Sequence, residues 1–100
     1  MSRKFDLMFH VTTPASLNIL VGLCSAAQRN GCRWVMFLTN DAVALASEPR
    51  LQPVIKSAMR IVVCESSWER FAPEQVCPVE MGSQTSNSEM IGFARHVISL

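Results

Sequence analysis

The chain consists of short apolar runs separated by segments in which apolar residues recur every three or four positions. The runs have the pattern of strands, and the segments between them have the pattern of helices. Short runs of mostly apolar residues are typical of strands covered on both faces of a parallel sheet. The runs lie at residues 5–11, 33–39, 61–64, 76–81 and 97–99. Pro78 lies inside the fourth run and favours an edge strand or an irregular ladder there. The pattern therefore predicts a sheet of about five strands.

Helical spacing fills the intervals between these runs. After the first run, apolar side chains recur every three or four positions and form one helix face, with members Leu17, Leu20, Val21, Cys24 and Ala27. Thr13 is suited to cap this helix, Pro14 to begin it and Gly31 to end it. Further helices are predicted at residues 40–47, 51–59, 66–71 and 86–96. Strands alternating with helices imply one α/β domain over residues 1–100, with a mostly parallel sheet covered by helices on both faces.

Composition and charge exclude two classes of partner. The chain has 100 residues, of which 49% are hydrophobic and 17% charged, as in a well-packed globular protein. Its formal net charge is +1, and Lys and Arg are scattered rather than gathered in a stripe, so no nucleic-acid partner is expected. No apolar run reaches the roughly 18–20 residues that span a bilayer, so no membrane partner is expected either.

The four cysteines have to be interpreted together with the compartment. The first residues lack the apolar segment and the cleavage site of a signal peptide, which predicts a cytoplasmic protein. Thiols stay reduced there, so a disulfide framework is not expected. The spacing of the cysteines lacks the Cys-x-x-Cys pairs of a structural zinc site. Glycine-rich phosphate loops and a His-Glu-x-x-His motif are also missing from the sequence, so neither a cofactor nor a metal is expected.

Cys64 is the candidate catalytic residue, because it falls where the apolar run 61–64 gives way to a helix. In alternating α/β chains, ligands bind at the carboxyl ends of parallel strands. A thiol at that point meets the first free N–H groups of the next helix, which favour the thiolate. Ser66 and Ser67 are suited to cap the helix, whereas the neighbouring Glu65 carboxylate disfavours the thiolate.

Four further residues are candidates for binding. Arg70, in the helix after Cys64, is expected to reach an anionic group held at the sulfur. Asn40 and Asp41 follow the second strand and His10 lies near the end of the first, so they are expected at the same sheet edge. Helix capping for Asn40 and Asp41, and partial burial for His10, are the structural alternatives. A formal triad of Asp41, His10 and Cys64 would require a geometry that the sequence does not give.

The other three cysteines are expected to be structural. Cys24 lies on the apolar helix face, Cys32 precedes the second strand and Cys77 opens the fourth. Cys32 and Cys77 should then lie one strand length, roughly 17–23 Å, from Cys64. Disulfide-bonded Cα atoms lie within about 7 Å. Neither cysteine is therefore expected to pair with Cys64 inside one subunit.

The order of elements and several local motifs resemble the DsrE/DsrF-like proteins of sulfur relay. The likeness runs from the Thr-Thr-Pro turn at 12–14, through segments 34–43 and 61–70, to the closing helix and strand at 90–100. Ala42 stands where the family has glycine, and Phe71 follows Arg70 where the family often has Arg-Gly. The resemblance covers nearly the whole chain, and the segment around the cysteine is its most specific part.

The resemblance implies a three-layer α/β/α domain that assembles into dimers, trimers or hexamers. It also implies that a cysteine at the position of Cys64 receives sulfane sulfur as a persulfide and passes it to a partner protein. The leading hypothesis is a sulfur carrier or sulfurtransferase-like subunit, with sulfur donor and acceptor proteins as partners. The alternatives are a non-catalytic oligomeric scaffold or small-ligand-binding module of the same fold, and a redox sensor that uses Cys64 across a subunit interface.

Overall fold

Five parallel strands form the centre of the structure, a computed structural model that describes residues 4–100. The strands are β1 (Phe5–Val11), β2 (Trp34–Leu38), β3 (Arg60–Cys64), β4 (Glu80–Gly82) and β5 (Ala94–Ser99). They form one sheet in the order β4-β3-β2-β1-β5, and all four neighbouring pairs are parallel. The carboxyl ends of the described strands therefore meet at one edge of the sheet, as the sequence predicts.

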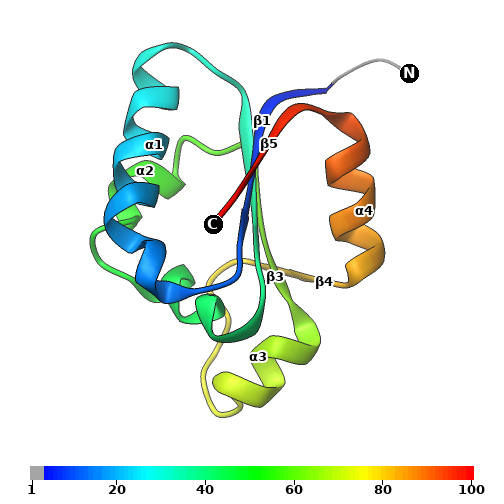
Figure 1. Ribbon diagram of the computed structural model, residues 1–100. Helices are drawn as coiled ribbons and strands as arrows, with labels where there is room; N and C mark the ends of the chain where they lie inside the picture. The colour runs from blue at the N-terminus through cyan, green and yellow to red at the C-terminus, as the bar shows by residue number, and fades with distance from the viewer. Residues whose placement is uncertain (1–3) are drawn as a thin grey trace.

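Helices cover both faces of this sheet. α1 (Leu17–Arg29) and α2 (Gln52–Ile55) lie on one side, and α4 (Gln84–Phe93) lies on the other (Figure 1). α3 (Glu65–Phe71) lies beyond the carboxyl end of β3. Two 3₁₀ helices, η1 (Pro14–Ser16) and η2 (Asn40–Ser47), come after β1 and β2. The predicted three-layer α/β/α architecture with five strands is confirmed.

The sheet separates two hydrophobic cores, because successive strand residues point to opposite faces. The larger core, on the α1 side, includes Phe9 and Trp34, whose rings meet edge to face at 5.6 Å. The smaller core, on the α4 side, includes Phe37, Cys64 and Met90. Cys64 therefore belongs to the part of the interior that α4 covers.

Several element boundaries differ from the prediction. The strand expected at 76–81 is reduced to β4, the helix expected at 51–59 is reduced to α2, and residues 40–47 form a 3₁₀ helix. The last helix begins before residue 86, because Ser83 and Ser86 form a reciprocal capping box. That helix also ends before residue 96, because β5 pairs with β1 from Ala94 onward and its backbone hydrogen bonds replace helical ones.

The described residues also determine what can be said of membrane-spanning helices, metal ligands and cysteines. Among the helices of residues 4–100, none is both long enough and apolar enough to cross a membrane. Within the same residues, no three His, Cys, Asp or Glu side chains are grouped so that they could hold a metal ion. All four cysteines are free thiols.

Candidate functional site

Cys64 lies at the carboxyl end of β3 and is the N-cap residue of α3. Its Cα is in register with Gly82 on β4, and Thr39 follows β2 on its other side. The residue is only 6% exposed. The predicted position at a strand end is confirmed, and the thiol lies just below the surface rather than in open solvent.

Polar groups surround the sulfur on three sides. The amide nitrogen of Gln84, at the start of α4, lies 3.7 Å from Sγ and donates a hydrogen bond to it. Burial raises the pKa of the Cys64 thiol, but hydrogen bonds from Ser67, Gln84 and Thr39 together outweigh burial, so that the pKa lies below its usual value of 9.0. Ser67 contributes through both its side chain and its backbone. The site therefore favours the thiolate, which is the nucleophilic form.

The hydroxyl of Ser67 is the centre of a small network beneath the thiol. The backbone N–H of Asn40 donates to Ser67 Oγ at 2.9 Å, and Thr39 Oγ1 lies 3.3 Å from the same atom. Because the Asn40 N–H occupies an acceptor site, the Ser67 proton is available to Thr39 or to the sulfur. Asn40 adopts a left-handed backbone with φ 56°, a conformation that Asn tolerates better than most residues.

The start of α4 approaches Cys64 closely because β4 ends in glycine. A Cβ on Gly82 would lie 2.7 Å from Val62 Cγ1 and 2.9 Å from Ser86 Oγ, so no larger residue fits without displacement. Ser83 then caps α4, and Gln84 becomes its first residue. This close packing places the Gln84 side chain over the sulfur.

Among the residues predicted to bind, Asn40 joins the network around Cys64, and it does so through its backbone. Asp41 is exposed in the first turn of η2. Arg70 lies in the last turn of α3, where its guanidinium is 5.2 Å from the ring centroid of Phe71. The structure does not bring Arg70 to Cys64, so a role for Arg70 at the sulfur stays a prediction.

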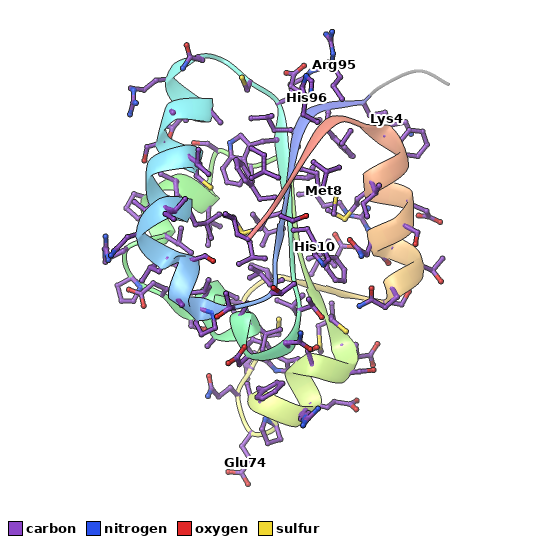
Figure 2. The ribbon with its side chains drawn as sticks, in the orientation of Figure 1. Lys4, Met8, His10, Glu74, Arg95 and His96 are labelled. Atoms are coloured by element: carbon purple, nitrogen blue, oxygen red, sulfur yellow. The ribbon has the colours of Figure 1, made fainter. Side chains whose placement is uncertain are left out.

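His10 lies on the α4 side of the sheet (Figure 2) and pairs in register with Phe37 on β2, whose ring centroid is 6.0 Å away. Two strand spacings, about 10 Å, separate β1 from β3, where Cys64 lies. His10 Nε2 is buried without a hydrogen-bond partner, and burial lowers the pKa of the imidazole. With Phe37 between them, His10 and Cys64 do not form a triad with Asp41.

The remaining cysteines lie apart from this site. Cys24 is fully buried in the α1-side core, as predicted, and burial raises the pKa of its thiol to about 12. Cys32 precedes β2, as predicted. Cys77 lies in the loop before β4 instead of opening the strand, and its sulfur is 3.2 Å from the carbonyl oxygen of Val79.

Three residues at the sulfur were not among the predicted binding residues, namely Ser67, Gln84 and Thr39. Ser67 was expected only to cap the helix after Cys64. Thr39 was detectable, because it ends the second apolar run at the same sheet edge as Cys64. Gln84 was harder to detect, because the sequence places the last helix at residue 86 and leaves Gln84 in a loop. The Ser-x-x-Ser spacing of Ser83 and Ser86 is the signal that would have moved the start of that helix.

Comparison with known proteins adds no assignment to this site. No family model matches the chain, and no match was found among curated proteins or solved structures. The resemblance to DsrE/DsrF-like proteins therefore stays a prediction, and the functional argument rests on the geometry around Cys64.

Proposed function

We propose that this protein is a sulfur carrier or sulfurtransferase-like subunit that holds sulfane sulfur on Cys64. The Cys64 thiolate attacks the outer sulfur of a donor persulfide R–S–SH. A bond forms between the Cys64 sulfur and that outer sulfur, the S–S bond of the donor breaks, and the donor leaves as a thiolate. Attack of an acceptor thiolate on the outer sulfur then releases Cys64 as a thiolate again, so the transfer involves no net oxidation or reduction.

The observation that carries this proposal is the set of neutral donors around a buried thiol. Ser67, Gln84 and Thr39 supply hydrogen bonds that favour a negative charge on the sulfur. The same donors assist both transfers, because the Cys64 sulfur is anionic as the attacking thiolate and again as the thiolate that leaves when the acceptor takes the outer sulfur. The likeness of segment 61–70 to the cysteine segment of DsrE/DsrF-like proteins adds independent support.

Sulfur transfer requires that the donor and the acceptor can reach the Cys64 sulfur. Cys64 is 6% exposed, whereas the Gln84 side chain that lies against it belongs to an exposed residue. In this proposal, rotation of the Gln84 side chain opens a path for the incoming sulfur and its return covers the loaded persulfide. The cover would protect the persulfide from solvent thiols between donor and acceptor.

The proposal includes a setting and partners. We place the carrier in the cytoplasm, where its four free thiols stay reduced. Its partners are a protein that donates sulfane sulfur and a protein whose thiol accepts it. A homo-oligomer is the expected assembly, on the resemblance to DsrE/DsrF-like proteins.

Sulfur loading tests the proposal directly. Reduced protein is incubated with polysulfide, and its intact mass and cysteine peptides are measured. The expected result is one added sulfur atom on Cys64 that reductant removes and that the Cys64→Ser variant lacks. Cys32→Ser and Cys77→Ser are matched controls that should load normally. Loading that persists in Cys64→Ser, or that is absent from a folded wild-type protein, would overturn the assignment.

The low exposure of Cys64 favours one alternative, a scaffold or ligand-binding module in which the cysteine is only a packing residue. Alkylation separates the two functions. A packing cysteine reacts only when the protein unfolds, so its rate follows global stability. A carrier cysteine reacts in the native state, at a rate that stays constant when mild stabilising conditions are added.

A further inference from the structure

A chain of hydrogen bonds leads from the Cys64 sulfur into α4. The Gln84 amide nitrogen donates to Cys64 Sγ at 3.7 Å, and the Asn87 amide nitrogen donates to Gln84 Oε1 at 3.2 Å. Gln84 and Asn87 are three residues apart on α4, so their side chains lie on the same helix face. The sulfur, the first amide and the second amide are therefore connected in series.

The two amides differ in their freedom to move. Asn87 is 7% exposed and is held between α4 and the sheet, while Gln84 is exposed. A free Gln side chain can present either its nitrogen or its oxygen to a neighbour. The oxygen would repel an anionic sulfur, and the nitrogen stabilises it. The bond from Asn87 selects the second orientation, because it occupies the Gln84 oxygen.

We propose that Asn87 is a positioning residue for Cys64, which holds the Gln84 carboxamide with its nitrogen toward the sulfur. This inference deepens the proposed function and rests on it only in taking the Cys64 thiolate as the reacting group. Asn87 Oδ1 is buried and has no hydrogen-bond partner. An unpaired buried oxygen is costly. The side chain of Asn87 is therefore satisfied through its donor to Gln84 and not through its own oxygen.

Charged groups do not provide an equivalent contact at the sulfur. On β3 and β4, Arg60 and Glu80 pair with each other near the amino ends of their strands. On α4, Glu89 lines a cavity of about 150 Å³ beside Arg60, away from the strand ends. The other ionisable groups on elements near Cys64 are Glu65, Glu69 and Arg70 on α3, Asp41 on η2, and Asp6 and His10 on β1. Burial has the largest single influence on the pKa of Cys64 and raises it, and the groups that lower this pKa are the neutral donors Ser67, Gln84 and Thr39, so the orientation of the Gln84 amide matters.

Alkylation of Cys64 as a function of pH tests this role without any sulfur transfer. Peptide-resolved mass spectrometry follows Cys64 separately from the other cysteines in the wild type, Gln84→Ala, Asn87→Leu and the double variant. Each single variant should lower the thiolate fraction of Cys64 at neutral pH by about fivefold, the effect of one lost hydrogen bond, as read from the midpoint of the pH profile rather than from the absolute rate. The double variant should have the same midpoint as Gln84→Ala alone, because Asn87 acts through Gln84.

The controls separate positioning from folding. Ser88→Ala changes an exposed neighbour on the same helix and should react like the wild type. Asn87→Asp preserves the shape of the side chain but cannot donate from an ionised carboxylate, so it replaces Asn87→Leu if that variant fails to fold. A normal pH profile in a folded Asn87 variant, or effects that add in the double variant, would overturn the inference. Failed sulfur loading alone would overturn the proposed function and leave this measurement valid.

Discussion

Cys24 on α1 and Cys64 at the end of β3 are both buried thiols, but their surroundings act on them in opposite directions. Cys24 is enclosed by the apolar side chains of the α1-side core, and burial alone raises its pKa to about 12. Cys64 is buried at the sheet edge, where donors from Ser67, Gln84 and Thr39 lower its pKa despite the burial. The apolar core between α1 and the sheet therefore suppresses thiol chemistry, whereas the carboxyl edge of the sheet supports it.

The two thiols differ in pKa because hydrogen-bond donors that are not used within a helix or strand are present near Cys64 and not near Cys24. A helix such as α1 uses its N–H groups internally, so its buried face offers a cysteine only apolar contacts. At the carboxyl edge, β2, β3 and β4 end together and the chain turns into η2, α3 and α4. Polar residues that serve these turns, such as Thr39 and Ser67, remain beside the last strand residue. The same turns that end the strands thus supply the donors at Cys64.

The largest expected effect is the difference in reactivity between these two thiols. Burial raises the pKa of Cys24 to about 12, whereas the hydrogen-bond donors lower the pKa of Cys64 below its usual value. At neutral pH the thiolate fraction of Cys64 should therefore exceed that of Cys24 by on the order of a hundredfold or more. Site-resolved alkylation of the native protein measures this ratio, and full unfolding in denaturant should abolish it. Comparable native rates would show that the donors do not determine reactivity.

The sequence predicts the positions of both cysteines but not all of the residues that surround Cys64. The helix face that carries Cys24 and the strand end that carries Cys64 are both readable as local patterns, and both predictions are confirmed. Gln84 is not readable in this way, because it reaches the sulfur through a three-residue strand and a close contact of Gly82 with Val62. These depend on residues far apart in the chain, which periodicity does not report.

Arg70 differs from Gln84, because it is close to Cys64 in sequence but is not among the groups that contact the sulfur. A residue six positions after Cys64 lies about 9 Å further along an α-helix, so proximity in sequence does not place it at the N-terminus. In the structure its guanidinium packs over Phe71 instead. Helix geometry alone was sufficient to favour Ser67, three residues after Cys64, over Arg70 as a neighbour of the sulfur.

The second prediction tests how closely the carboxyl edge is packed. In Gly82→Ala the new Cβ would clash with Val62 and Ser86, so the end of β4 and the start of α4 must shift. We expect a loss of about 1–3 kcal/mol in the free energy of unfolding, together with a higher pKa of Cys64 in the pH profile of alkylation as the Gln84 donor moves away. Gly92→Ala is the matched control on α4, because nothing lies within 4 Å of its added Cβ. It should gain up to about 1 kcal/mol. Equal stability of the two variants would refute the close packing at Gly82.

The third prediction concerns the donor network beneath the thiol. Ser67→Ala removes the hydroxyl that accepts the Asn40 N–H and faces Thr39. The variant should lose about 1–2 kcal/mol of stability, because the Asn40 N–H loses its partner. The pKa of Cys64 should rise, since Ser67 is the first of the groups that lower it. Ser66→Ala, at an exposed neighbouring position, is the control and should change neither property. A pH profile of alkylation, with urea unfolding, distinguishes the outcomes.

The smallest expected effect concerns His10, which is half-buried on the same side of the sheet as Cys64 and whose buried Nε2 has no hydrogen-bond partner. Burial lowers its pKa from 6.5, so the folded protein disfavours the imidazolium. Above pH 6.5 both the folded and unfolded states keep His10 neutral, and the residue has no effect on the pH dependence of stability. As the pH falls from 6.5 through the native pKa, the unfolded chain takes up the proton first and stability is lost. His10→Leu should remove this acid-sensitive component from urea unfolding curves, and His96→Leu measures the contribution of the second histidine separately. If His10→Leu retains the full acid sensitivity of the wild type, burial does not control the protonation of His10. The difference in donors between His10 and Cys64 would then have no effect on how His10 ionises.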